Sequence, residues 1–422
     1  MRRPSGQRPV WLTAPLLSVA VLSVGAGIAQ FGVTTVIGDV AAHFGEHAEG
    51  DDLASELGMP ATTIGLALAI IRLSSLGALP TAAYADRVGR RRLLLGTVTI
   101  GLSLTLVAAA APGYWFYVAL VALSRPALTT INALAGVIAA EEATSKDRSS
   151  AIALIAVAYG IGSGIVSVGR GLLPGEPSFR VVTAFVLVPL LLLPLLAKRI
   201  REPKIADAAE PATGMPGTVP AGLRGRVAVL ALMAGILAIA TGPGFTYLFV
   251  YGEGVLGATP GQLSLLVVGA GPVGLLGLLA GRYGADHLGR RPMAAIGMVI
   301  TGMALLTAYG GGGFGMLAVG YLASIAGASA FGVPQGALAA EMVPTTTRAT
   351  VAGWITVSSV LGAVAGLAVF GFLADLTGSF ATAARGIGIL VSASSIGFVL
   401  LPETRGMELD EEVPQRRRRN RP

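Results

Sequence analysis

The segment AAYADRVGRRR, residues 82 to 92, has a near copy in GRYGADHLGRR, residues 281 to 291. Matching residues lie 200 positions apart, and the same offset holds for a glutamate and an arginine that bracket a later loop. Ordinary basic loops would explain the arginines but not the shared acidic and glycine positions. The repeat therefore predicts two structurally equivalent halves. It comprises Asp86 and Asp286, Gly89 and Gly289, Arg90 and Arg290, Arg91 and Arg291, Glu141 and Glu341, and Arg148 and Arg348.

The sequence around these loops is too apolar for a water-soluble protein. It is 53% hydrophobic and 13% charged with a mean hydropathy of +0.73, whereas soluble domains carry roughly a quarter charged residues. Its apolar runs, such as 61 to 84 and 351 to 374, are long enough to cross ~30 Å of hydrocarbon. Because they lack the alternating polarity of barrel strands, we predict an all-α membrane protein.

Glycine, proline and charged interruptions divide the chain into twelve expected spans, six in each half. The first is too long for the apolar part of a secretion signal, so we interpret it as a span. We predict a first six-helix bundle over residues 1–200, a linker over 201–225, a second bundle over 226–401 and a basic tail over 402–422. The expected spans are 11–38, 61–84, 93–111, 114–140, 149–170, 180–198, 226–250, 261–283, 292–309, 315–340, 349–371 and 381–401.

The basic residues predict how the chain is oriented in a membrane. Of the 30 Lys and Arg residues, 25 fall in the two termini and in alternate connections. Positively charged loops stay on the cytoplasmic side, so both termini are expected there. The connection from 39 to 60 contains six acidic residues and no Lys or Arg, and it is expected to face outward. We place the protein in the plasma membrane.

The two repeated loops resemble the signature loops of the major facilitator superfamily. The segment LPETRG, residues 401 to 406, is similar to the ending of the superfamily's sugar-porter and metabolite-symporter branches. The resemblance covers nearly the whole chain, although Ala82 stands where the family motif usually opens with glycine. It implies twelve transmembrane helices in two pseudo-symmetric six-helix bundles, and secondary active transport by alternating access.

The resemblance also implies a gate on the cytoplasmic side. It places Asp86 at the start of the helix near residue 349, and Asp286 at the start of the helix near residue 149. A carboxylate is favoured there because a helix N-terminus carries partial positive charge. The resemblance further pairs Arg90 with Glu141, and Arg290 or Arg291 with Glu341. The gate set is Asp86, Arg87, Gly89, Arg90, Glu141 and Arg148 with Asp286, Gly289, Arg290, Arg291, Glu341 and Arg348.

Two arginines fall near the middle of predicted spans. Arg72 and Arg125 lie about eleven residues into their helices, which is near the bilayer midplane at ~1.5 Å per residue. A charge there usually faces an internal cavity and acts on substrate or ions. No acidic residue lies at that depth, so the pair favours an anionic substrate. The structural alternative pairs each arginine with backbone carbonyls or with Ser74, Thr129 or Asn132. Further candidate lining residues are Gln30, Asn132, Tyr159, Phe245, Tyr247 and Gln335.

Proton coupling is also expected. Many family members have an arginine about twenty residues before the glutamate that matches Glu141; here that position is Val121, and Arg125 lies one turn further on. Asp39 is the best candidate proton carrier, and the alternative is an exposed charge at a helix end. The segment from 160 to 164 lacks the Gly-Pro pair of the family's antiporter motif, which favours uptake. A proton-coupled exporter of drugs or metabolites remains the alternative.

Other functional classes find little support. There is no cysteine, nucleophile elbow or phosphate-binding loop, and His43, His47 and His287 lie in or beside loops. We therefore expect neither an enzyme nor a cofactor or metal site. The net charge of +7 is explained by membrane topology rather than by nucleic acid binding. The expected partners are a small-molecule substrate, protons and membrane lipids, and the protein is expected to act as a monomer.

Overall fold

The computed structural model describes residues 13–45, 53–143, 147–173, 178–200, 219–344 and 347–405. Within them, twelve helical segments are long and apolar enough to cross a membrane. This confirms the predicted fold class. The first six spans are α1 (Ala14–Phe44), α3 (Ala61–Ser74) continued by α4 (Ala78–Ala83), α6 (Arg90–Ala108), α7 (Tyr114–Glu142), α8 (Arg148–Leu172), and α9 (Phe179–Thr183) continued by α10 (Leu187–Ala197).

The second half repeats this order. Its spans are α11 (Ala221–Thr246), α13 (Pro260–His287), α14 (Arg290–Tyr309), α15 (Gly313–Glu341), α16 (Arg348–Thr377), and α17 (Phe380–Ser394) continued by the 3-10 helix η5 (Ser395–Leu400). The shorter helices α2 (Leu53–Leu57), α5 (Ala85–Val88) and α12 (Leu248–Gly254) lie between spans.

Two predicted boundaries around the seventh span are wrong. α11 begins at Ala221, inside the predicted linker, with Pro220 as its N-cap, and Gly222 and Gly225 lie within the helix rather than before it. The span predicted to end at 250 breaks at Tyr247, and the chain continues as α12. Most of the predicted linker, and the basic tail beyond 405, lie outside the described residues.

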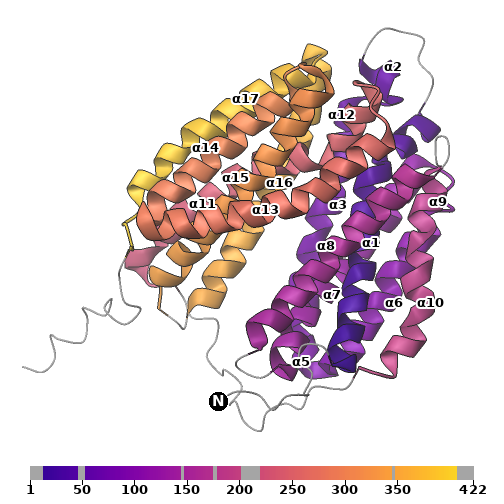
Figure 1. The fold of residues 1–422 in the computed structure, drawn as a ribbon, viewed down its shortest axis with the longest axis horizontal. Helices are drawn as coiled ribbons and strands as arrows, with labels where there is room; N and C mark the ends of the chain where they lie inside the picture. Colours follow the sequence, from indigo (N-terminus) through magenta and orange to yellow (C-terminus); the bar gives the residue numbers. More distant parts are fainter. Residues whose placement is uncertain are drawn as a thin grey trace, which may run out of the picture.

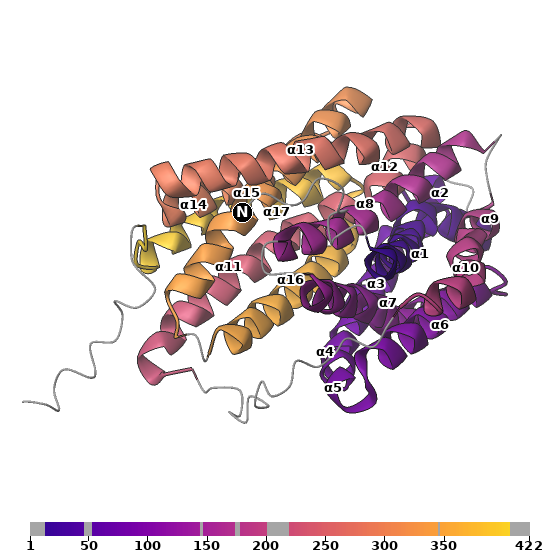
Figure 2. The ribbon, with the colours of Figure 1, turned by 60° about the horizontal axis from the view of Figure 1, so that its bottom comes forward.

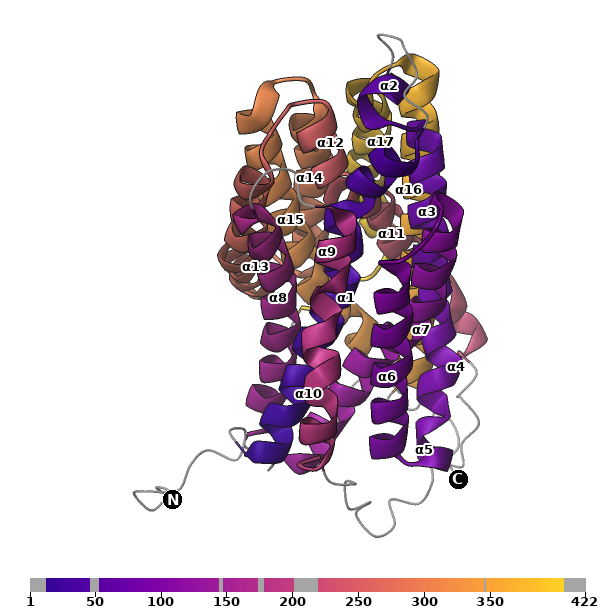
Figure 3. The ribbon, with the colours of Figure 1, turned by 90° about the vertical axis from the view of Figure 1, so that its right-hand side faces the viewer.

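The two halves form separate bundles that converge at one end of the molecule and diverge at the other (Figure 1). We call the diverging end, with α5 and the starts of α1, α11 and α14, the terminal face. We call the converging end, with α2 and α12, the opposite face; Figure 3 shows α5 and α2 at these two ends. In Figure 2, α1, α3, α7 and α8 belong to one group and α11, α13 and α15 to the other.

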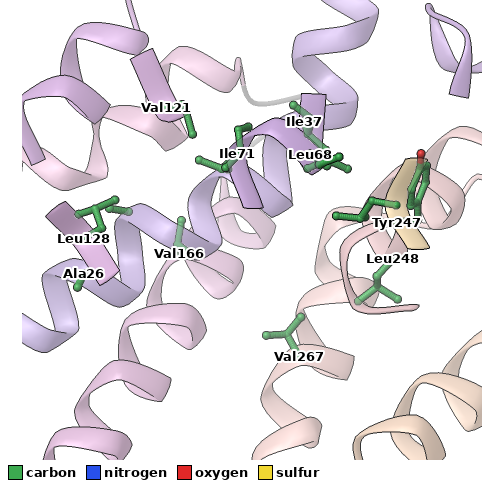
Figure 4. Close-up of a cluster of buried hydrophobic side chains, with 14 of the residues drawn as sticks. Ala26, Ile37, Leu68, Ile71, Val121, Leu128, Val166, Tyr247, Leu248 and Val267 are labelled. Carbon is green, nitrogen blue, oxygen red and sulfur yellow. The ribbon is translucent and has the colours of Figure 1, made fainter. Parts of the chain in front are cut away.

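One buried apolar core runs through both bundles. Figure 4 shows part of it, with Ile71 and Val166 from the first half and Leu248 and Val267 from the second. Lipid is as apolar as these side chains, so close packing supplies much of the helix–helix stabilisation in a membrane. Small residues at the contacts are therefore expected to matter more than the apolar residues themselves.

The closest approach within the first bundle is between α1 and α8. A Cβ atom on Gly27 would lie 2.2 Å from the carbonyl oxygen of Tyr159, and one on Gly162 would lie 2.2 Å from that of Val24. Gly160, on the same helix, has nothing within 4 Å of a Cβ position. The glycines at 27 and 162 are thus required by packing, as small residues are in other membrane helix pairs.

Substituting Gly162 by valine is expected to separate α1 from α8 and to lower the free energy of unfolding by about 1 to 3 kcal/mol, as overpacking does elsewhere. The thermal midpoint of the detergent-solubilised protein, read by the loss of the monodisperse peak, measures this change. Gly160→Val is the matched control and should leave the midpoint within error. Equal midpoints for the two variants would contradict the packing argument.

Candidate functional site

The opposite face is closed by an ionic cluster that joins the two halves. Arg170, near the end of α8, is only 2% exposed. Its Nη2 donates to Asp39 of α1 at 2.7 Å and to Glu253 of α12 at 2.6 Å, and its Nη1 also bonds Glu253. The ring of Phe249 lies 5.5 Å from the guanidinium carbon. A buried charge needs such partners, and here one of them comes from each half.

A second closure joins α3 to α16. The carboxylate of Asp375, near the end of α16, accepts hydrogen bonds from the backbone N–H groups of Ala61 and Thr62, both at 2.8 Å. These are the first two residues of α3, so the carboxylate caps a helix N-terminus in the other half of the protein. The Tyr247 hydroxyl donates to the carbonyl of Ala61 at 2.9 Å. Gly371 packs against the same residue, at a distance that leaves no room for a side chain.

α8 and α13 form a third contact at this face. The Ser264 hydroxyl donates to the carbonyl of Ser167, and Gly171 packs against Gly261. The contacts that join the halves thus gather on the opposite face. They hold α1, α3 and α8 of the first half against α12, α13 and α16 of the second.

Below this closure a cavity of about 330 Å³ lies between the halves. α1, α3, α7 and α8 form one wall, and α11 and α16 form the other. Five of the candidate lining residues line it, and four of them come from the first half: Gln30, Arg72, Arg125 and Tyr159. Phe245 lines it from α11. The structure therefore brings the two arginines, which lie on different helices, to the same cavity.

The cavity wall of the first half offers hydrogen-bond donors without acceptors. Arg125 Nε and Gln30 Nε2 are buried and have no hydrogen-bond partner. The other polar atom of Gln30, Oε1, accepts from the Tyr159 hydroxyl at 3.3 Å. Arg72, Arg125 and Tyr159 line the same wall, and among the described residues no acidic side chain lines the cavity. The wall can therefore bind a group that brings acceptors and negative charge.

The structural alternative for the arginines fails for its named side chains. The Ser74 hydroxyl donates to the carbonyl of Ile71. Thr129 Oγ1 and Asn132 Oδ1 are buried without any hydrogen-bond partner, so neither pairs with Arg125.

The repeated loops make the same contacts in both halves. Arg90 pairs with Glu141, and Arg290 pairs with Glu341 at 3.4 Å. The Nε of Arg148 donates to the carbonyl of Ala140 at 3.0 Å, and that of Arg348 to Ala340 at 3.0 Å. Arg91 donates to the carbonyls of Ala197 and Ile200, and Arg291 to those of Phe398 and Val399. Gly89 and Gly289 precede helices at φ of 98° and 114°, where other residues are strained.

These contacts brace each half rather than join the two. Asp286 is exposed and pairs with Arg290 of its own half at 3.3 Å, so the expected contact with the start of α8 is not formed in this conformation. The physical reason is the divergence of the bundles at the terminal face. Arg87 is exposed, and the side chain of Asp86 lies outside the described part of the chain. Glu403, from the LPETRG segment, accepts from the backbone N–H groups of Arg290 and Arg291.

Comparison with known families settles where this architecture belongs. The model of the family described as Major Facilitator Superfamily matches residues 19–284. The chain belongs to the major facilitator superfamily. A second family model, described as Sugar (and other) transporter, matches residues 221–414. A comparison with curated protein sequences returned no match.

Solved structures with the superfamily fold are similar to this chain over most of its length. The nucleoside transporter NupG (D323A mutant) is 13% identical with a TM-score of 0.74, covering 91% of this chain and 99% of that one. A bacterial homologue of the human lysosomal transporter Spinster, inward-facing and unoccupied, is 16% identical with a TM-score of 0.70, covering 94% and 96%. The xylose transporter XylE from E. coli, inward open, is 16% identical with a TM-score of 0.69, covering 94% and 98%. At these identities the likeness shows the fold alone.

Three candidate lining residues, Tyr247, Asn132 and Gln335, do not line the cavity, and Asp39, the candidate proton carrier, lies near the C-terminal end of α1. Tyr247 is fully buried in the opposite-face closure, and Asp39 is held there by Arg170. Asn132 and Gln335 do not line the cavity, although each has a buried polar atom without a partner. Val121, at the family's arginine position, is a core residue with 1% exposure.

Sequence reasoning missed two functional residues of the closure. These residues are Arg170 and Asp375. Both lie near the ends of long apolar helices, where a charge is unremarkable. Their partners belong to the other half, so no local sequence pattern signals them.

Proposed function

We propose that this superfamily member is a secondary active transporter that moves a small organic anion by alternating access, in the uptake direction and coupled to protons. The observation that carries the proposal is the cavity between the two halves, where the described part of the chain places unpaired donors and two arginines but no acidic side chain. Binding an acid there would satisfy groups that are otherwise left buried and unpaired. The closed opposite face supports the alternating part of the proposal, because a transporter must seal one side while the other is open.

The basic connections support a cytoplasmic location for the terminal face. In the proposed orientation the conformation described here is closed to the outside, with both termini cytoplasmic in the plasma membrane. The protein would act as a monomer surrounded by lipid, because each half already contributes one wall of the cavity.

Protons are proposed to enter through the opposite face. Asp39 and Glu253 line a cavity of about 530 Å³ there, together with Arg170 and Glu56. Three carboxylates and one guanidinium share this space, so protonation of one carboxylate would weaken the Arg170 cluster and favour opening. Coupling would follow if opening toward the outside required that proton.

Uptake into proteoliposomes tests the function. The panel contains monocarboxylates, dicarboxylates, sugars and nucleosides, each with and without an imposed pH gradient, acid outside. We expect at least one acid to accumulate when the gradient is present, and Arg125→Ala to slow its uptake at least tenfold. Asp39→Asn should retain flux but lose stimulation by the gradient. Flux that does not depend on the gradient would contradict proton coupling. Proton-driven efflux faster than uptake would show that the protein is an exporter. Unchanged uptake in Arg125→Ala would contradict the anion site.

The Asp86→Asn substitution tests the gate implied by the superfamily motif. The change is expected to slow uptake severalfold while leaving membrane insertion normal, because a neutral amide interacts less well with a helix N-terminus. Initial rates in reconstituted vesicles, normalised to inserted protein, measure it. Glu142→Gln, on the same face, is the control for loss of a nearby carboxylate. Equal rates for wild type and Asp86→Asn would count against the gate.

A further inference from the structure

The two walls of the central cavity differ in chemistry. The wall of the first half contains Arg72, Arg125, Gln30 and Tyr159. The wall of the second half, from α11 and α16, has no charged residue and no amide side chain among the residues that the structure describes. The asymmetry limits what kind of anion can bind there.

The charged wall is suited to one acidic group. Gln30 is 93% buried, since its exposed fraction is 7%, and its Nε2 lacks an acceptor, as does the buried Nε of Arg125. The Gln30 carbonyl is already bonded to the Tyr159 hydroxyl. A bound group at this wall must therefore accept hydrogen bonds and need not donate any. A carboxylate does this and also neutralises positive charge, whereas a hydroxyl would leave its own proton unpaired.

The facing wall is suited to an apolar group. Phe245 and Leu367 supply carbon surface to it. The Thr246 hydroxyl is already used, since it donates to the carbonyl of Gly242 at 2.7 Å. Phe31 and Leu68 extend the apolar surface from the first half. The other hydroxyl of the facing wall is that of Thr241. Two threonine hydroxyls are too few to pair the several hydroxyls of a sugar or a second charge, so such a solute would lose more hydration than this wall replaces, which is costly.

We infer that the substrate is an amphipathic monoanion, with its single acidic group against Arg72 and Arg125 and its apolar body against Phe245 and Leu367. This inference rests on the proposed transport function and names the substrate class of the same site. Sugars, nucleosides and dicarboxylates are the wrong class, because each would place polar groups against the uncharged wall. The cavity of about 330 Å³ is at the small end of the range for ligand pockets, about 300 to 1,000 Å³, which favours a small body such as one aromatic ring or a short alkyl chain.

Ligand binding to the full-length protein in nanodiscs tests the class, with phenylacetate, hexanoate, phenylacetamide, succinate and glucose as probes. Stabilisation against thermal unfolding reports binding because a ligand that binds only the folded state raises the midpoint. We expect phenylacetate and hexanoate to bind at least tenfold more tightly than the neutral amide, succinate or glucose. Arg125→Ala should remove the preference for the acid over the amide, and Phe245→Ala should weaken phenylacetate at least fivefold while keeping that preference.

A variant that gains affinity controls for misfolding, because a misfolded protein would not bind a ligand more tightly. Thr241→Lys adds a cation to the uncharged wall and should raise succinate affinity at least tenfold while lowering that of hexanoate. Gln335→Ala, outside the cavity, is the control and should change neither. Tighter binding of glucose or succinate than of both monoanions to wild type, or no monoanion binding at all, overturns the inferred class. Monoanion binding without flux in proteoliposomes would instead overturn the transport function and leave the class intact.

Discussion

Replacing Arg170 by alanine is expected to open the opposite face. In the closed conformation the guanidinium lies between Asp39 of the first half and Glu253 of the second. Without it, the two carboxylates would face each other across the contact, and opening would relieve their repulsion. Removing one member of a buried ion pair costs about 3 to 5 kcal/mol. If about 3 kcal/mol of this is specific to the closed state, the ratio of closed to open protein falls by roughly a hundredfold.

Distances between spin labels measure that ratio. The chain contains no cysteine, so each introduced pair is unique. Trp115→Cys with Thr382→Cys, both exposed residues of the opposite face, reports on opening there. Lys198→Cys with Arg282→Cys, exposed at the terminal face, should report closure of that end in the same samples. Uptake should slow as well, because the return to the inward-open state becomes unfavourable.

Arg180→Ala is the matched control for Arg170→Ala. Arg180 is also an arginine of the first half near the opposite face, but it donates to the backbone carbonyls of Ala109 and Ala111 within its own bundle. Its loss should lower thermal stability without changing either label distance. An unchanged opposite-face distance in Arg170→Ala would show that the ionic cluster does not hold the halves together.

The fold could be predicted because its determinants are local or periodic in sequence. Span length follows from hydropathy, and the repeat at an offset of 200 residues fixes the equivalence of the halves. The Arg148 and Arg348 contacts with Ala140 and Ala340 show that the repeat extends to individual hydrogen bonds. The break at Tyr247 was not predicted, because the apolar run continues through it without a charged residue.

Sequence reasoning could identify only those cavity residues whose burial in a membrane is costly. Arg72 and Arg125 are conspicuous because few charges are tolerated at the bilayer midplane. Neutral polar residues such as Asn132 and Gln335 carry no such signal. The helices are apolar on every side, so a single sequence does not show whether these residues face the cavity. Tyr247 was assigned to the cavity for its polarity, but its hydroxyl is used in the closure.

Asp375→Asn is expected to weaken the closed opposite face as well, by a smaller amount. An asparagine of the same shape offers one acceptor oxygen in place of two, so one of the N–H groups of Ala61 and Thr62 loses its partner, and the charge at the helix N-terminus is lost. Hydrogen bonds to charged groups contribute about 1.5 to 3 kcal/mol. A change of about 2 kcal/mol lowers the ratio of closed to open protein by roughly thirtyfold. The same label pairs measure it, and a ratio equal to that of wild type would contradict the role of Asp375.

The helix pair α3 and α16 is then expected to carry one such carboxylate latch at each end. Asp375 of α16 caps the start of α3 at the opposite face, and Asp86, just beyond α4, is predicted to cap the start of α16 when the terminal face closes. Asp86→Asn should therefore shift the distribution toward the conformation described here, and Asp375→Asn away from it. Because both changes act on one equilibrium at distant sites, their free energies should add. The double variant should show label distances between those of the single variants; distances equal to those of either single variant would show that the two latches are not opposed.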